Sequence, residues 1–243
     1  MLKDKYKDIF NFIEDKFSRL IVEPGVLYVV ATPIGNLDDI SFRAIYVLKN
    51  VDLIAAEDTR RTGQLLSFYG IKNKIVSYYS QVESRKIDYI MTELKDRKSV
   101  ALVSDAGTPC ISDPGSILVN ACLENGIRVV PIPGANSVIQ SLVMSGFETD
   151  TFYFQGFLPI KKGRETRLEE LKNIKDVIVI FESKFRIKKT MSELKKFFSS
   201  KDYVLFRELT KKFEESVRGN FSNLDLNKIK EVGEFVIIIN NSR

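Results

Sequence analysis

Two carboxylates, Asp105 and Asp113, stand in a twelve-residue stretch rich in glycine and proline, Ser104 to Gly115 (S-D-A-G-T-P-C-I-S-D-P-G). An apolar, largely β-branched run, Val100 to Val103, precedes this stretch, and an amphipathic run follows it. Glycine and proline at this density fix an unusual backbone path and let a ligand approach the main chain closely. Ligands of open α/β sheets bind at the carboxyl ends of strands, so the stretch predicts a ligand site there.

A plainer interpretation of the same stretch stays open. Asp113 can cap the following helix, with Pro114 in its first turn, which is an ordinary way to start a helix. This interpretation accounts for the end of the stretch but not for residues 105–109.

A second group with chemical potential is E-D-T-R-R-T, residues 57–62, which follows the alanine pair A-A at a predicted strand end. Asp58 or Thr59 can simply cap the next helix. Carboxylates beside Arg60 and Arg61 at a strand end also suit catalysis or anion positioning, and both interpretations stay open. Because the chain has no histidine, a proton acceptor must be a carboxylate, Lys, Tyr or water.

Two further loops follow predicted strands. A-T-P-I-G-N-L-D-D, residues 31–39, lacks both glycine-rich phosphate-binding patterns, so a ligand without phosphates fits it better. P-I-P-G-A-N-S, residues 131–137, turns at Gly134 and offers Asn136 or Ser137 as a helix cap. Together the four loops present backbone N–H and C=O groups, which suits a zwitterionic, adenine-bearing ligand.

The basic second half predicts contact with a polyanion. Residues 1–150 carry 17 Lys+Arg and 19 Asp+Glu, a net of −2, whereas residues 151–243 carry 20 and 13, a net of +7. The segment K-K-G-R-E-T-R, residues 161–167, places four cations close to an aromatic residue, Phe157. This combination suits contact with an RNA backbone. Lysine spread over solvated helix faces is the alternative. F-E-S-K-F-R and R-E-L-T-K-K, residues 181–186 and 207–212, again place carboxylates and cations at strand ends.

Composition excludes several classes of protein. Apolar residues make up 44% and charged residues 28%, and no apolar run reaches the ~20 residues that span a bilayer. The N-terminus alternates charges and lacks the apolar centre of a signal peptide, so we expect a cytoplasmic protein. The absence of histidine excludes His-based zinc sites and Ser-His-Asp triads, and we expect no metal. Two cysteines, Cys110 and Cys122, should stay reduced.

Strand and helix patterns alternate along the chain. The first half predicts strands near 26–31, 51–56, 75–78, 99–103 and 127–131, and helices near 40–48, 59–69, 82–96, 114–125 and 135–145. The second half predicts strands at 151–155, 176–182, 202–208, 213–218 and 234–240, and helices near 164–173, 185–198 and 223–230.

The alternation predicts a two-domain α/β protein. Residues 1–25 form a helical extension, with an amphipathic helix over 3–21. Residues 26–147 form a mostly parallel sheet with helices on both faces. Residues 148–243 form a mixed sheet that includes an antiparallel hairpin around 209–212. We expect the ligand site in the cleft between the two.

These segments resemble one family closely, the small-subunit ribosomal RNA 2′-O-methyltransferases of the tetrapyrrole methylase superfamily. The matching motifs run in order over most of the chain, from Leu27 to Ile239: T-P-I-G-N-L-D-D, A-A-E-D-T-R, A-L-V-S-D-A-G-T-P-x-I-S-D-P-G, V-V-P-I-P-G, G-F-L-P, F-E-S, R-E-L-T-K and G-E-F-V-I-I-I. The resemblance implies S-adenosylmethionine folded between two domains, methylation of a cytidine 2′-hydroxyl in the decoding region of 16S rRNA, and a homodimer.

The resemblance implies the cofactor-binding residues, and the chemistry of the residues at strand ends gives candidates for the proton acceptor and for RNA contacts. Cofactor binding is expected at Pro33, Ile34, Gly35, Asp105, Ala106, Gly107, Thr108, Pro109, Ile111, Gly134, Asn136, Ser137, Gly156 and Phe157. The proton acceptor is expected at Asp58, then Asp105, then Glu182, with Lys184 as a further candidate and Arg60 holding phosphate. RNA contacts are expected at Arg60, Arg61, Lys161, Lys162, Arg164, Arg167, Lys184 and Arg186.

The chain departs from the family pattern in two motifs. The segment Y-Y-S-Q-V-E, residues 78–83, lacks the histidine that the family carries there, so a histidine role is absent or replaced. Ala135 and Asn136 follow P-G where the family has proline and a small residue, which bears on ligand packing.

Other functions fit the same sequence less well. A corrin or porphyrin methylase on the same fold would not need a net charge of +7 on its second half. A non-catalytic RNA-binding factor would not need four cofactor loops. A nicotinamide oxidoreductase would need the glycine fingerprint that the chain lacks.

Overall fold

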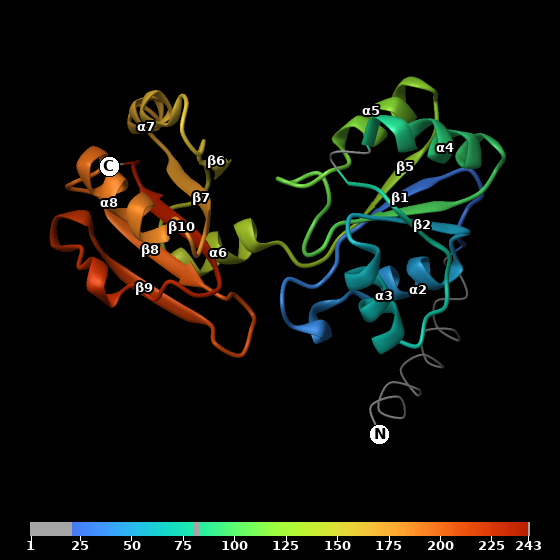
Figure 1. Ribbon diagram of the computed structural model, residues 1–243, viewed down its shortest axis with the longest axis horizontal. Coiled ribbons are helices and arrows are strands. Elements are labelled where there is room, and N and C mark those ends of the chain that lie inside the picture. The colour runs from blue at the N-terminus through green and yellow to red at the C-terminus, as the bar shows by residue number, and fades with distance from the viewer. Residues whose placement is uncertain (1–20, 80–82, 243) are drawn as a thin grey trace. The chain divides into compact units, whose positions relative to one another are not determined.

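The computed structural model describes residues 21–79 and 83–242, and places the backbone but not the side chains of residues 83–85. The chain forms two compact units, the first ending at Asn136 and the second beginning at Ser137 (Figure 1). The helix expected over residues 3–21 lies outside the described residues, apart from its last position. No helix within the described ranges is long and apolar enough to cross a membrane.

The first unit is built on a five-stranded, fully parallel sheet in the order β3-β2-β4-β1-β5. Its strands are β1 (Leu27–Val30), β2 (Leu53–Ala56), β3 (Ile75–Ser77), β4 (Val100–Val103) and β5 (Val129–Ile132). The predicted βαβ series is therefore confirmed.

Helices cover both faces of this sheet (Figure 1). One core joins Tyr28 and Ile54 to α2 (Phe42–Asn50) and α3 (Thr59–Phe68). The other joins Leu27 and Leu53 to α4 (Glu83–Lys95) and α5 (Ser116–Glu124). Neighbouring residues of one strand point to opposite faces, which explains why these strands are apolar without alternation.

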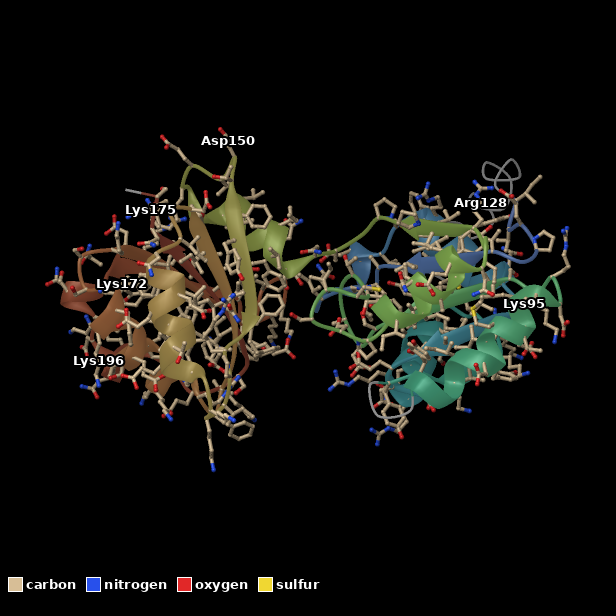
Figure 2. The ribbon with its side chains drawn as sticks, turned by 90° about the horizontal axis from the view of Figure 1, so that it is seen from above. Lys95, Arg128, Asp150, Lys172, Lys175 and Lys196 are labelled. Atoms are coloured by element: carbon tan, nitrogen blue, oxygen red, sulfur yellow. The ribbon has the colours of Figure 1, made fainter. Side chains whose placement is uncertain are left out.

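The second unit contains a mixed sheet in the order β6-β7-β10-β8-β9. Its strands are β6 (Phe152–Phe157), β7 (Val177–Ser183), β8 (Asp202–Arg207), β9 (Glu215–Asn220) and β10 (Glu234–Asn240). β6 and β7 are parallel, and the other neighbours are antiparallel. The predicted mixed sheet and the β8–β9 hairpin are confirmed. Asp150 and Lys175, which lie just before β6 and β7, mark the amino ends of these strands (Figure 2).

Helices α7 (Arg164–Lys172) and α8 (Ile187–Phe197) pack on one face of the mixed sheet. α6 (Ser137–Ser145) lies against β10, and Arg218 of β9 donates hydrogen bonds to the carbonyl oxygens of Ser145 and Met144. These contacts group α6 with the second unit, so the chain divides before this helix rather than after it, at 147, as the sequence suggested.

The helix predicted near residues 223–230 is wrong. Two short 3-10 turns, Phe221–Asn223 and Leu226–Lys228, stand there instead. The side chains of Asn220 and Asp225 each accept the N–H two residues on, and each turn ends in an extended residue. Local hydrogen bonds of this kind compete with helix propagation.

Candidate active site

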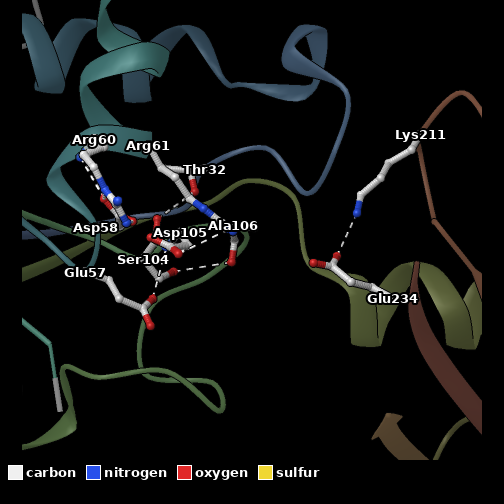
Figure 3. Close-up of polar contacts among 10 residues, drawn as sticks. All are labelled: Thr32, Glu57, Asp58, Arg60, Arg61, Ser104, Asp105, Ala106, Lys211 and Glu234. Atoms are coloured by element: carbon white, nitrogen blue, oxygen red, sulfur yellow. Dashed lines mark hydrogen bonds and ion pairs between the residues drawn. The ribbon is translucent and has the colours of Figure 1, made fainter. Parts of the chain in front are cut away.

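The carboxyl ends of the parallel strands place four loops at one edge of the first sheet. Two of these loops are joined directly. The Thr32 N–H donates to the Gly107 carbonyl at 2.9 Å, and the Gly107 N–H donates to the Thr32 carbonyl at 3.0 Å. The Thr32 hydroxyl also donates to the Ser104 carbonyl at 3.3 Å (Figure 3). The loop after β1 and the loop after β4 therefore form one rigid unit.

The loop after β5 joins the same assembly. The Thr108 hydroxyl donates to the Ala135 carbonyl at 3.3 Å, and the Asn136 side-chain amide donates to the Thr108 hydroxyl at 3.2 Å. A Cβ on Gly134 would lie 2.9 Å from the Ala31 Cβ, so only glycine lets this loop pass so close to β1.

Gly107 is the second position that requires glycine. Its φ is +80°, and an added Cβ would lie 3.3 Å from Ile34 Cγ2 and 3.8 Å from the Ala135 carbonyl oxygen. Gly107 thus lies where the loops after β1, β4 and β5 come together, and a larger residue would force them apart.

The expected helix start at Asp113 and Pro114 is wrong, because the N-cap of α5 is Gly115 and the helix begins at Ser116. Gly115 has φ +133°, and a Cβ there would lie 2.7 Å from Leu102 Cδ2 and 2.8 Å from Cys110 Sγ. Asp113 lies instead near the other carboxylates of the site.

Three carboxylates gather at the ends of β2 and β4: Glu57, Asp105 and Asp113. Asp105 donates its backbone N–H to Glu57 Oε2 at 3.2 Å, and its Oδ2 lies 3.3 Å from Arg61 Nη1 (Figure 3). Asp105 Oδ1 is buried and has no hydrogen-bond partner among the described residues. A buried acceptor without a partner is costly, so a ligand that donates a hydrogen bond to this oxygen would be stabilised there.

Burial and mutual repulsion raise the pKa of two members of this cluster, Glu57 and Asp113. Burial, followed by the charges of Asp105 and Asp58, raises the pKa of Glu57 above its ordinary value. Burial, then the charges of Glu57 and Asp105, raises the pKa of Asp113 to about 6. The cluster therefore favours a positively charged ligand, which would lower the repulsion.

Asp113 gives a pH-dependent prediction. Its raised pKa means that the folded protein favours the neutral carboxyl, so its stabilising contribution is complete below pH ~4 and is lost as the pH rises through about 6. We therefore expect the free energy of unfolding of Asp113→Asn, relative to that of the parent, to increase by about 1 kcal/mol as the pH rises from 4 to 7.5. This figure allows for screening of a partly exposed group. Chemical denaturation at both pH values measures this, and a difference independent of pH would contradict it.

Asp58 is engaged locally. Its carboxylate accepts the Arg60 N–H at 2.8 Å as the N-cap of α3, and it pairs with the Arg60 guanidinium through Nε at 3.1 Å and Nη2 at 2.7 Å. These bonds to Arg60 hold the pKa of Asp58 well below its usual range. The capping role is thus present, and a carboxylate so strongly stabilised in its charged form is a poor proton acceptor.

A pocket of about 380 Å³ opens beside Asp105 and the loop after β1. This volume lies within the usual range for small-molecule sites, ~300–1,000 Å³. Its lining residues are Thr32, Pro33, Gly35, Leu37, Arg61, Thr62, Gln64, Leu65, Phe68, Ser104 and Asp105. Of the lining residues from α3, the sequence predicted only Arg61 as a site residue and missed Thr62, Gln64, Leu65 and Phe68, although positions 61, 64, 65 and 68 recur at helical spacing on one face.

The remaining cofactor residues expected in the first unit lie in or beside these loops. Ile34 is buried, whereas Ile111 is 41% exposed, and Ala106 and Pro109 flank Gly107 and Thr108. Ser137, Gly156 and Phe157 belong to the second unit, at the start of α6 and the end of β6. Gly156 lies at a bulge in the β6–β7 register.

The cations expected to contact RNA differ in availability. Arg164 is buried, and it binds Glu193 at 2.7 Å, the Thr190 hydroxyl at 2.6 Å and the Pro159 carbonyl at 2.8 Å. Arg186 pairs with the fully buried Glu182 at 2.8 Å, so Glu182 supports the fold rather than facing solvent.

Arg167 is held by Glu170, Gln155 and Tyr153. In contrast, Lys161, Lys162 and Lys184 form no ion pair with any residue that the structure describes.

Two further expectations concern the histidine that the family carries after the third strand and the absence of a metal site. In the segment that lacks the family's histidine, Tyr78 is fully buried and Tyr79 is 38% exposed, and residues 80–82 lie outside the described residues. Although Glu57, Asp105 and Asp113 lie near one another, no group of three Cys, Asp or Glu side chains within the described ranges is arranged to hold a metal ion.

Known proteins resemble this chain at two levels. A family model for tetrapyrrole (corrin/porphyrin) methylases matches residues 26–225. Ribosomal RNA small subunit methyltransferase I of Pasteurella multocida is 46% identical over 223 residues, 88% of this chain and 79% of that protein. The protein of the same name from Bacillus subtilis is 43% identical over 221 residues, 90% and 76% of the two chains.

Solved structures agree in fold. A cobalt precorrin-4 methyltransferase superposes with a TM-score of 0.64 at 18% identity, covering 88% of this chain and 94% of that one. Uroporphyrin-III C-methyltransferase from Thermus thermophilus, complexed with S-adenosyl homocysteine, gives a TM-score of 0.63 at 15% identity, covering 89% and 98%. The chain therefore belongs to the tetrapyrrole methylase family and, within it, to the group of proteins named ribosomal RNA small subunit methyltransferase I.

Proposed function

We propose that this protein is an S-adenosylmethionine-dependent methyltransferase of small-subunit ribosomal RNA. The observation that carries the proposal is the 43–46% identity to proteins of that name over most of both chains. The finer proposal is that it methylates the ribose 2′-hydroxyl of a cytidine in the decoding region of 16S rRNA. A cytoplasmic location follows from such a substrate, and a homodimer remains a prediction that sedimentation can test.

The residues of the first unit fit S-adenosylmethionine. The joined loops around Thr32, Gly107 and Ala135 offer backbone groups at close range, and none carries a glycine-rich phosphate pattern. Asp105 Oδ1 is an unpartnered buried acceptor suited to an ammonium or hydroxyl donor. The neighbouring carboxylates Glu57 and Asp113 favour a cation such as a sulfonium.

In this proposal the cofactor is held in the first unit by the loops after β1, β4 and β5. The residues concerned are Pro33, Ile34, Gly35, Asp105, Ala106, Gly107, Thr108, Pro109, Ile111, Gly134 and Asn136. Ser137, Gly156 and Phe157 are proposed contacts from the second unit. When bound, the cofactor supplies an electrophilic methyl group on a positively charged sulfur.

The protein's own contribution is to orient the ribose hydroxyl and receive its proton. We assign this role to Asp105 rather than Asp58, because Asp105 has a free oxygen whereas Asp58 is bound to Arg60. In this role the Asp105 carboxylate would hold the 2′-hydroxyl through its free oxygen and would take up the proton that this hydroxyl loses on methylation. Arg61, which pairs with Asp105, keeps this carboxylate in place. Positioning supplies much of the rate in such a transfer.

Single-turnover methyl transfer tests the proposal. Labelled S-adenosylmethionine and small ribosomal subunits that lack the modification should give label in the RNA, and the labelled cytidine linkage should resist alkali because its 2′-oxygen is blocked. A tetrapyrrole methylase of the same fold would instead label a corrin or porphyrin precursor. Label on such a precursor and none on RNA would overturn the proposal.

The basic segment of the second unit gives a separate prediction. Because Lys161 and Lys162 have no ion-pair partner among the described residues, they are available to phosphate. The double variant Lys161→Gln/Lys162→Gln should reduce the slope of log affinity against log salt by about 0.7 for each phosphate of single-stranded RNA that these lysines neutralise in the parent. Fluorescence anisotropy measures this, and S-adenosylmethionine affinity is the control. An unchanged salt slope would place the RNA elsewhere.

A further inference from the structure

Three exposed phenylalanines stand at strand ends of the second unit. Phe157 ends β6 and is 52% exposed, Phe185 lies two residues after β7 and is 84% exposed, and Phe213 lies between β8 and β9 and is 65% exposed. Single exposed apolar side chains are ordinary, but several that gather at the same ends of neighbouring strands are typical of an interaction site.

Strand directions bring the three to one edge of the sheet. β6 is parallel to β7, and β7 and β8 are both antiparallel to β10, so the carboxyl ends of β6, β7 and β8 coincide. The register confirms the alignment, because Phe157 faces Phe181, and Val236 faces both Phe181 and Phe206. Three strand spacings separate β6 from β8, so the carboxyl ends of these strands span about 15 Å. Asp150 and Lys175 lie at the opposite edge (Figure 2).

Each phenylalanine ring has a cation above it. Arg186 lies 6.0 Å from the Phe157 ring centre, Lys184 lies 5.1 Å from that of Phe185, and Lys212 lies 5.6 Å from that of Phe213. We call these three rings and their cations the aromatic edge. A ring for stacking and a cation for phosphate, placed side by side, are the two components of single-strand binding surfaces.

The aromatic edge and the lysines near it carry a net positive charge. Four of its carboxylates are in ion pairs: Lys211 binds Glu234 (Figure 3) and Glu208, Arg207 and Lys230 bind Glu215, and Arg186 binds Glu182. Glu214, beside Phe213, accepts the Thr210 N–H and has no ion pair among the described residues. Lys161, Lys162, Lys184 and Lys212 are left without an ion pair among the described residues. This surface therefore suits an anionic partner rather than an apolar one.

The loop that carries Phe213 is held rigidly. Glu208 and Thr210 have φ of +54° and +64°, which non-glycine residues rarely adopt. Lys211 joins Glu208 at 3.0 Å to Glu234 at 2.8 Å, and the Thr210 N–H donates to Glu214. Because the loop is ordered before any ligand arrives, binding costs little further conformational entropy.

We propose that the aromatic edge binds a single-stranded segment of RNA, with unpaired bases stacked on Phe185 and Phe213 and phosphates near the lysines. The inference rests on the proposed function and extends it by specifying unpaired bases. A duplex keeps its bases stacked within the helix, so a base that stacks on an exposed ring must be unpaired.

Binding of a labelled mixed-sequence single-stranded RNA, compared with a duplex of the same sequence, tests the proposal. Phe185→Leu and Phe213→Leu should each weaken single-strand binding about fivefold or more, equal to ~1 kcal/mol for each base that no longer stacks, with an unchanged salt slope. Duplex binding should change less than twofold. Lys184→Gln and Lys212→Gln should instead lower the salt slope by about 0.7 each.

Matched controls come from the opposite edge of the sheet. Phe152→Leu alters a 40% exposed phenylalanine at the amino end of β6, and Lys175→Gln alters an exposed lysine before β7; both should bind like the parent. Equal affinities of the Phe185, Phe213 and Phe152 variants would overturn the proposal. So would a dimer that Phe185→Leu dissociates, because a second copy would then occupy this edge. Since the readout is RNA binding, absent methyl transfer with these differences retained would overturn the proposed function alone.

Discussion

Asp105→Asn is expected to slow methyl transfer to small ribosomal subunits at least ~100-fold, the usual loss for a missing general base. Asparagine keeps the shape of the side chain, but it cannot accept the hydroxyl proton or provide the negative charge that faces Arg61. Because Asp105 is also a proposed cofactor contact, the rate should be measured in a single turnover at saturating S-adenosylmethionine, which excludes product release.

Asp58→Asn is the matched control for this prediction. Asparagine can still cap α3, so the free energy of unfolding should stay close to that of the parent. The rate should stay within about threefold of the parent, well short of the loss expected for a general base. If Asp58→Asn is slow and Asp105→Asn is not, the proton acceptor is Asp58, and our assignment is wrong.

Gly107→Val should weaken S-adenosylmethionine binding at least tenfold, or ~1.4 kcal/mol. Valine is strained at φ +80°, and its Cβ would lie 3.3 Å from Ile34 Cγ2, at the position where three loops meet. Either effect would move the backbone groups that we propose to bind S-adenosylmethionine. Isothermal titration calorimetry measures the affinity directly.

Gly126→Val separates loop geometry from backbone strain. Gly126 also has a positive φ, +68°, but no atom lies within 4 Å of a Cβ added there. We expect both variants to lose stability, Gly107→Val by more because its Cβ also meets Ile34, and we expect a loss of cofactor affinity in Gly107→Val alone. Parental affinity in a folded Gly107→Val protein would remove these loops from the cofactor site.

The sequence predicted strands and helices well where burial alone decides them. Strands β1, β2 and β4 are buried on both faces, so continuous apolar runs such as Val100 to Val103 predict them. The mixed sheet was predictable because the β8–β9 hairpin is a short-range feature. Prediction failed at residues 223–230, where Asn220 and Asp225 side chains close single turns that a helical pattern does not reveal.

The chemistry of the candidate site was harder to predict than the placement of its loops. The sequence placed four loops at the carboxyl ends of the parallel strands, where the structure has them, but residue types do not show which carboxylate keeps a free oxygen. Asp58 and Asp105 are the same residue type, and both follow a predicted strand. Only the structure shows that Asp58 is bound to Arg60 whereas Asp105 keeps an oxygen without a partner. The burial of Arg164 was hidden for the same reason, since its partners Glu193 and Thr190 are distant in sequence.

The strand order of the first unit has a consequence for synthesis of the chain. β1 bonds only to β4 and β5, and β4 lies between β1 and β2. As the chain leaves the ribosome, β1 has no strand to pair with until Val103 has emerged. The loop with Asp105 and Gly107 follows immediately, so its closure onto Thr32 can occur only once that central strand is in place. Substitutions in β4 should therefore harm folding yield in cells more than similar substitutions in the edge strand β3.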